Sequence, residues 1–391
     1  MQKIDQNLID RVETLNNDKE IECLIYSNNF FATKKCLKNF SPCEFPFIKA
    51  FGLKMKKDSI YNFANFNHID YITSEAKVFA QINVAKKVIN VDKLHSQNIT
   101  GKGVTVAVID TGVYPHIDFL CPKNKIICFK DFVNKKKFPY DDNGHGTFVA
   151  GAILGGGAKN KKYQGIAYNS NLISLKALDS NGETGAFTIL EAMQWIYDNK
   201  DKYNIKVVCM SFGSTPSKIN DPLKTGAEKL WNSGIVVVAA AGNSGPSEET
   251  IKSPGISNKI ITVGALDDNR NELDEINIDN YTIANFSSRG PAFNFYKPDC
   301  VASGVNINGL KNNKSFYTKM SGTSVATPIV AGVCALLCEK YPKITPNQLK
   351  YTLLKNCKTI NGDRNEEGFG VINADLWFKN IKLKKYLYLC A

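Results

Sequence analysis

Four side chains that together can hydrolyse an acyl bond occur in this chain in the order Asp110, His145, Asn243 and Ser324. A serine hydroxyl is a weak nucleophile at neutral pH, so it needs an imidazole base, and the base needs a carboxylate to orient it. An amide side chain can donate a hydrogen bond to the oxyanion that forms. This set of residue types predicts nucleophilic catalysis through Ser324.

Ser324 lies in the stretch KMSGTSVATPIVAGVCALL, which places its hydroxyl in the first turn of an apolar helix. Free backbone N–H groups and the partial positive charge at a helix start stabilise an anion there. Gly322 lets the backbone approach a substrate, and Pro328 is tolerated within the first turn. The alternative is a serine that only caps a core helix. The motif alone does not decide between the two.

His145 differs from the other three histidines because it stands between two glycines in DDNGHGTFVAGAIL, at the start of another small-residue helix. His68 lies in a polar stretch, His95 in a surface helix and His116 in a loop after a strand. We expect those three to be structural. The glycines beside His145 suit a side chain that must meet a substrate, because they allow close backbone approach.

Asp110 and Asn243 each close an apolar strand. Residues 104 to 109 form an apolar run typical of a buried parallel strand, and Asp110 ends it. The carboxyl ends of such strands are where α/β sheets present functional residues. Asn243 closes GIVVVAAAGNSGP, where its amide could reach an oxyanion. Both residue types are also common turn formers, which is the alternative for each.

Strands and helices alternate between these motifs, which predicts an α/β fold with a doubly wound, mostly parallel sheet and right-handed crossovers. The chain has 391 residues, 43% of them hydrophobic, enough for one large core and a small satellite domain. We expect strands near 172 to 177, 207 to 211, 235 to 239 and 260 to 264, and helices near 187 to 199, 222 to 232 and 345 to 356.

The motifs VIDTG, NGHGT, AAAGN and GTSVATP together resemble those of the subtilisin-like serine peptidases, or subtilases, of the intracellular bacterial type with an N-terminal propeptide. The resemblance covers about residues 82 to 378. It implies a serine endopeptidase in which Asp110 orients the imidazole, His145 is base and then acid, and Ser324 is acylated. Asn243 and the Ser324 backbone N–H would form the oxyanion hole. Phe148 replaces the family's second histidine, which is outside the catalytic set. The alternative is a noncatalytic scaffold or regulator with this fold.

The resemblance also implies two edges that hold an extended peptide as an added strand, and a specificity pocket beside the nucleophile. The implied edge and pocket residues are Ser211, Phe212, Gly213, Leu178, Gly182, Ala240, Ala241, Gly242 and Lys252. A buried ammonium of Lys252 at the pocket base would favour an acidic or amide side chain before the scissile bond. The alternative for Lys252 is a solvated surface lysine.

Residues 1 to 81 form a separate unit, with strands expected near 21 to 26, 47 to 55 and from 69, and helices near 31 to 38 and 58 to 64. This α+β unit resembles a subtilase propeptide, which implies an intramolecular chaperone and inhibitor whose tail lies in the substrate groove. We expect self-cleavage near Gln81-Ile82, with Val78 in an apolar subsite, and a catalytic domain over 82 to 391. The alternative is a small domain that is never removed.

No cofactor is expected to be required. Subtilases often hold a structural calcium ion, and Asp118 matches a carboxylate ligand, but the nearby loop GGGAKNKKYQG carries three lysines. We therefore expect that calcium site to be absent or rebuilt. GGGAK lacks the remainder of a phosphate loop, so ATP binding is not expected.

The formal net charge of +12 raises nucleic-acid binding as a rival function, with lysine-rich segments at 134 to 137 and 159 to 162. These segments lack interleaved aromatic residues, so we expect no nucleic-acid partner. The first twenty residues lack the apolar core of a secretory signal, which favours a cytoplasmic location, and the apolar runs are too short to predict a membrane partner. The 11 cysteines include no CxxC pair, which favours reduced thiols. The expected partners are protein or peptide substrates and the chain's own N-terminal domain.

Overall fold

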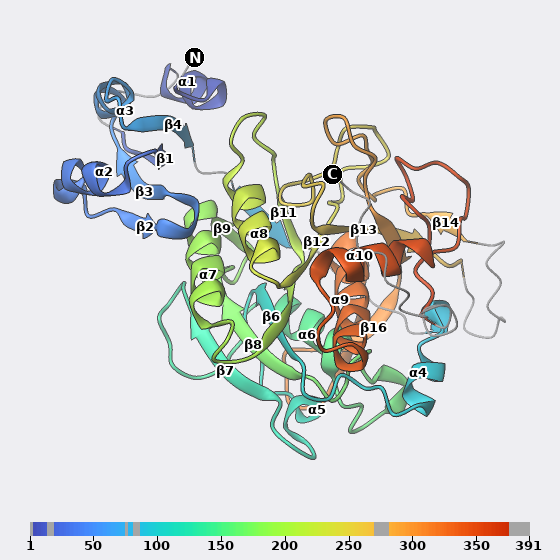
Figure 1. Cartoon of the computed structure of the whole chain (residues 1–391). Helices are drawn as coiled ribbons and strands as arrows, with labels where there is room; N and C mark the ends of the chain where they lie inside the picture. The colour runs from blue at the N-terminus through green and yellow to red at the C-terminus, as the bar shows by residue number, and fades with distance from the viewer. Residues whose placement is uncertain (1–2, 14–18, 75–76, 81–86, 270–280, 375–391) are drawn as a thin grey trace.

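The computed structural model describes residues 3–13, 19–74, 77–80, 87–269 and 281–374. Its centre is an eight-stranded sheet in the order β14-β13-β12-β10-β6-β8-β7, with β15 beside β13 (Figure 1). Neighbouring strands run parallel except for β13 and β14. This confirms the predicted α/β fold with a doubly wound, mostly parallel sheet. The strands are β6 (Thr105–Asp110), β7 (Ile126–Asp131), β8 (Asn171–Lys176), β10 (Ile205–Met210), β12 (Val236–Ala240), β13 (Ile261–Asp267), β14 (Thr282–Ile283) and β15 (Cys300–Ser303).

The central strands are buried on both faces, which is why they are continuous apolar runs and not alternating ones. All six residues of β6 and all five of β12 are buried. Two pairs of helices cover the sheet: α6 (His145–Leu154) with α9 (Thr323–Lys340), and α7 (Ala186–Asn199) with α8 (Pro222–Asn232). Helices α8 and α9 both pack on β12, but each has a different partner helix: α9 packs against α6, and α8 packs against α7. The two pairs therefore lie on opposite faces of the sheet.

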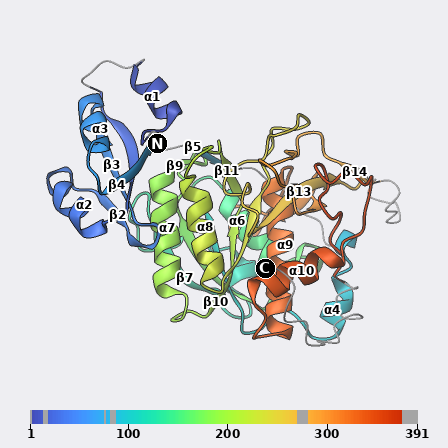
Figure 2. The same cartoon turned by 45° about the horizontal axis from the view of Figure 1, so that its top comes forward.

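One crossover departs from the predicted hand. The connections β7–α6–β8 and β8–α7–β10 move in the same direction across the sheet, yet α6 and α7 cover opposite faces (Figure 2). The two connections therefore have opposite hands, and the expectation that all crossovers are right-handed is wrong for one of them. The exception places the start of α6 on the same face as the start of α9.

The N-terminal unit is a four-stranded antiparallel sheet in the order β2-β3-β1-β4. The strand predicted over 47 to 55 begins only at Ala50, because Pro46 starts a short 3-10 turn that runs to Ile48. Helix α1 and strand β2 were not predicted. The elements are α1 (Gln6–Glu13), β1 (Ile21–Ser27), α2 (Phe30–Cys36), β2 (Cys43–Phe45), β3 (Ala50–Met55), α3 (Lys57–Ala64) and β4 (Ile69–Ser74).

Strand β1 serves two cores through its alternating side chains. Cys23 and Ile25 point into a small core under the N-terminal helices. Leu24 and Tyr26 point the other way and belong to the large core around the eight-stranded sheet. The N-terminal unit therefore packs on the larger one through an apolar face, against α7 and α8 (Figures 1 and 2).

Helix α9 is the apolar centre of the molecule: sixteen of its residues, from Thr323 to Cys338, are buried. Among the described residues it is the one helix long and apolar enough to cross a membrane, but 89% of that window is buried inside the protein. The full length of α9 was not predicted from the sequence. None of the ten cysteines that the structure describes forms a disulfide bond. Further elements are β16 (Ile307–Leu310), β17 (Tyr317–Met320), α4 (Asp92–Ser96), α5 (Ile117–Leu120) and α10 (Pro346–Lys355).

Candidate active site

Asp110 is the last residue of β6 and has no solvent exposure. Its Oδ1 accepts a hydrogen bond from the Thr111 backbone N–H at 2.7 Å and lies 2.5 Å from His145 Nδ1. Its Oδ2 has no hydrogen-bond partner among the residues that the structure describes. A buried carboxylate that faces an imidazole in this way orients the ring and stabilises its protonated form.

His145 is the first residue of α6, and the turn before it is held by Asp141. Asp141 Oδ1 accepts from the Gly144 backbone N–H at 2.8 Å, and Oδ2 accepts from the Thr147 backbone N–H at 2.8 Å. Asp141 also accepts from the Thr111 hydroxyl, which follows β6. The start of α6 is therefore tied to the end of β6, and this fixes the imidazole next to Asp110.

Gly146 makes the approach of α6 to β6 feasible. A Cβ at this position would lie 2.1 Å from the Gly112 carbonyl oxygen, a distance at which the backbone would have to move. The glycines beside His145 were predicted to allow close approach of a substrate. The structure gives Gly146 a different reason, which is close approach of two backbone segments of the protein itself.

Ser324 is the second residue of α9, and its Oγ lies 3.5 Å from His145 Nε2. The three side chains are separated by 35 and 179 positions in the sequence and are nonetheless within reach of one another. A contact of 3.5 Å is longer than an optimal hydrogen bond, as is common in sites that hold no substrate. The arrangement can pass a proton from the serine hydroxyl to the imidazole.

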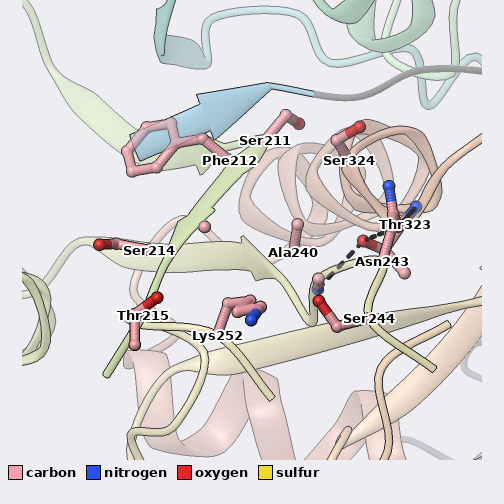
Figure 3. Close-up of a pocket in the computed structure, with 12 residues that line it drawn as sticks. Ser211, Phe212, Ser214, Thr215, Ala240, Asn243, Ser244, Lys252, Thr323 and Ser324 are labelled. Atoms are coloured by element: carbon pink, nitrogen blue, oxygen red, sulfur yellow. Dashed lines mark hydrogen bonds between the residues drawn. The ribbon is translucent and has the colours of Figure 1, made fainter. Parts of the chain in front are cut away.

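Asn243 follows β12 and is oriented by Thr323. Asn243 Oδ1 accepts from the Thr323 backbone N–H and from its hydroxyl, both at 2.9 Å. Because the oxygen is engaged, the amide nitrogen remains as the donor toward Ser324, to which Asn243 lies close in Figure 3. Thr323 was not predicted as a site residue; its signal in the sequence was its place directly before the candidate nucleophile.

Lys176 is a second residue that the sequence analysis missed. It is fully buried at the end of β8, in register with Asp110 of the neighbouring strand. Its ammonium donates to the Thr111 and Leu178 carbonyls at 2.7 and 3.0 Å, and to Asp142 Oδ1 at 2.6 Å. It therefore joins the three segments that surround Asp110 and His145. A polar residue that ends an apolar strand was the available signal.

A short strand from the N-terminal part lies beside this site. The backbone of β5 (Lys77–Ala80) pairs antiparallel with β9 (Glu183–Gly185) on one side and with β11 (Phe212–Ser214) on the other. These two strands include the edges predicted to hold an extended peptide. Of the predicted edge residues, Phe212 and Gly213 pair with β5, whereas Leu178 and Gly182 lie in the segment before β9.

A cavity of about 240 Å³ opens next to Ser324 (Figure 3). Ala240, Gly242 and Lys252, which were predicted for the specificity pocket, line this cavity, whereas Ala241 does not. The lining residues are Ser211, Phe212, Gly213, Ser214, Thr215, Ala240, Gly242, Asn243, Ser244, Lys252, Thr323 and Ser324. The nucleophile, the candidate oxyanion donor and the predicted pocket thus border one space.

The surroundings of Asp118 do not fit a calcium ion. Its carboxylate oxygens accept from the backbone N–H groups of Gly157 and Ala158 at 3.0 and 3.1 Å. The ammonium of Lys125 donates to the Asp118 and Leu154 carbonyls at 3.1 and 2.9 Å, and burial lowers the pKa of Lys125 to about 8. Carbonyl oxygens that could serve a cation therefore already face a lysine. Within the described part of the chain, no cluster of three His, Cys, Asp or Glu side chains is arranged for a metal ion.

The chain is similar to a large set of proteases. A family model described as the subtilase family matches residues 101–370. The chain is 42% identical over 334 residues to the serine protease AprX of Bacillus subtilis. This alignment covers 78% of the chain and 73% of AprX. It is 34% identical over 290 residues to subtilisin DY of Bacillus licheniformis, covering 73% and 95%. It is 32% identical over 288 residues to a thermostable alkaline protease of Halalkalibacterium halodurans, covering 73% and 70%. The segment that the family model matches contains Asp110, His145, Asn243 and Ser324.

Proposed function

Because this chain belongs to the subtilase family and is a subtilisin-like serine endopeptidase, we propose that it hydrolyses peptide bonds through an acyl-enzyme on Ser324. The observation that carries the assignment is the continuous contact from Asp110 through His145 to Ser324. In this mechanism His145 Nε2 takes the hydroxyl proton as Ser324 Oγ attacks the peptide carbonyl carbon. The buried carboxylate of Asp110 stabilises the imidazolium that results.

The tetrahedral oxyanion is held by the Asn243 amide and by the backbone N–H of Ser324 at the start of α9. Thr323 keeps the amide aimed correctly by engaging its oxygen. Collapse of the intermediate breaks the C–N bond, and His145 delivers its proton to the leaving amine. Water then attacks the ester while His145 takes a proton from that water. Collapse of the second tetrahedral intermediate breaks the C–O bond to Ser324, His145 returns the proton to Ser324 Oγ, and the acid product leaves.

A direct test is covalent labelling of Ser324 with a fluorophosphonate, combined with cleavage of an unstructured protein substrate. Wild type should be labelled once per chain and should cleave, whereas Ser324→Ala should do neither. Ser321→Ala is the matched control, because Ser321 stands three positions earlier, outside α9. Labelling and cleavage that persist in Ser324→Ala would refute the assignment. A folded wild type from which residues 1–81 have been removed, and which is neither labelled nor active, would support the noncatalytic scaffold.

We also propose that residues 1–81 act as a propeptide and that the chain cleaves itself after Gln81. Gln81 and Ile82 lie outside the described residues, so the support comes from β5. Ala80 pairs with Phe212. Gln81 follows Ala80 in the sequence, and Ser211, which precedes Phe212, borders the cavity beside Ser324. The predicted roles of the N-terminal unit as inhibitor and chaperone remain part of this proposal, as do a cytoplasmic location and the absence of a required cofactor.

Intact-mass measurement of wild type and Ser324→Ala tests the self-cleavage. Wild type should lose residues 1–81, and Ser324→Ala should keep them. Retention of Met1 in fully active wild type would contradict the proposal and favour a small domain that is never removed. Cleavage of Ser324→Ala at the same bond in a purified preparation would show that another protease is responsible.

A further inference from the structure

Lys252 has a place in the cavity that the hydrolysis of a peptide bond does not require. Its side chain lies at the end away from Ser324, below Ala240 in Figure 3, with Thr215 and Ser244 on either side. The residue is partly buried. Lys252 therefore lines the predicted pocket and is not a fully exposed residue.

Two glycines hold the aliphatic part of Lys252 in the cavity. A Cβ on Gly213 would lie 2.6 Å from Lys252 Cβ, and a Cβ on Gly242 would lie 2.4 Å from Lys252 Cγ. The stem therefore packs between two bare backbone segments, one on each wall. The Lys252 backbone is fixed as well, because its N–H donates to the Ala241 carbonyl at 2.8 Å. This leaves little freedom for the stem to leave the cavity.

The charge on Lys252 is not balanced within the described part of the protein. No described carboxylate forms an ion pair with it, and its ammonium makes no hydrogen bond to a described residue. The residues that line the cavity include hydroxyl and amide groups but no Asp or Glu. This differs from the buried Lys176 and Lys297, which pair with Asp142 and Asp299. An unbalanced cation at the end of a substrate cavity calls for an anion from the substrate.

We propose that Lys252 makes this enzyme prefer a side chain with an oxygen acceptor immediately before the scissile bond, most strongly Glu or Asp and next Gln, which is the residue at the proposed self-cleavage site. The inference rests on the proposed function of Ser324, because the cavity is a specificity pocket only if the bond is cut beside it. A substrate carboxylate in the cavity receives a charge-assisted hydrogen bond from the ammonium, and the hydroxyls of Thr215 and Ser244 lie nearby. Substrate lysine or arginine at the same position meets a like charge.

The test compares peptide substrates that differ only in the residue before the scissile bond: Glu, Gln, Leu or Lys. For wild type, kcat/KM should be highest for Glu, and the Glu to Leu ratio should fall as salt is raised. In Lys252→Met, which keeps the stem and removes the charge, the Glu to Leu ratio should fall by about 10- to 100-fold, as expected for a charge-assisted hydrogen bond. Lys252→Arg should keep the preference for Glu, and Lys252→Glu should favour Lys.

Fluorophosphonate labelling of Ser324 in each variant separates this inference from the proposed function. Normal labelling with an unchanged Glu to Leu ratio in Lys252→Met would overturn the role of Lys252 and leave the catalytic assignment intact. A wild type that prefers Leu over Glu would overturn the inference without any variant. If wild type itself is not labelled at Ser324, the proposed function on which the inference rests is wrong.

Discussion

Replacing Asp110 by Asn removes the charge that faces His145 and leaves the shape of the site almost unchanged. Asp110 Oδ1 accepts from the Thr111 N–H and contacts His145 Nδ1, while Oδ2 has no described partner. The asparagine oxygen therefore takes the position of Oδ1, because the amide nitrogen there would face the Thr111 N–H donor. The imidazole keeps the correct tautomer, and the expected loss is electrostatic.

The size of that loss follows from the burial of the pair. Unit charges about 4 Å apart contribute about 4 kcal/mol at an effective dielectric constant of about 20. Since about 1.4 kcal/mol of barrier corresponds to a factor of ten in rate, Asp110→Asn should lower kcat roughly 1,000-fold. The asparagine amide nitrogen is left buried without a described acceptor, so a modest loss of thermal stability should accompany the loss of rate.

The assay is the hydrolysis of a peptide substrate at saturating concentration by enzyme from which residues 1–81 have been removed. A trace of affinity-tagged wild type, removed before the assay, would process variants that cannot process themselves. Asp201→Asn is the matched control, since the Asp201 side chain is 92% exposed. A drop in kcat of less than tenfold for Asp110→Asn, in a variant that unfolds at nearly the wild-type temperature, would refute the electrostatic role assigned to Asp110.

Three further predictions concern stability. A chelator should leave the melting temperature unchanged, because the Asp118 site is occupied by backbone donors and Lys125; a fall in melting temperature that calcium restores would contradict this. Burial lowers the pKa of Lys297 from 10.5 to about 8, so the unfolded chain keeps this proton to a higher pH than the folded chain does. The unfolding free energy of wild type should therefore rise relative to Lys297→Met between about pH 8 and 10.5, by at most about 1.4 kcal/mol per pH unit, and a constant difference would disprove the shift. Gly309→Ala should cost about 1 to 3 kcal/mol in chemical denaturation, because the new Cβ would lie 2.4 Å from the Phe148 ring. Adding Phe148→Leu should recover part of that loss, and a fully additive double mutant would count against direct contact.

The fold was predictable from sequence where buried strands leave continuous apolar runs. The helix over 222 to 232 was predicted with its observed bounds, since Asp221 caps it and Pro222 occupies its first position. The strand β2 was not predicted, because it has only three residues and two of them are exposed. The hand of the β7–α6–β8 connection was not predictable either, since it depends on which face of the sheet α6 covers.

The grouping of Asp110, His145 and Ser324 was predictable because each motif carries its own local signal at a strand end or helix start. Thr323, Asp141 and Lys176 carry weaker signals. Their importance comes from contacts with segments distant in sequence, such as the ammonium of Lys176 near Thr111. Supporting residues of this kind are defined by three-dimensional neighbours, and a single sequence does not contain that information.

The strand β5 is covalently attached to the molecule whose groove it enters, and this determines how β5 competes with a free peptide for that groove. A tethered segment experiences an effective concentration in the millimolar range that dilution does not change. A free peptide must therefore outcompete it at comparable concentration, however little protein is present. Under the proposed inhibition by residues 1–81, the extent to which β5 excludes a free peptide would not depend on the protein concentration, and activity would begin with a cleavage within one molecule.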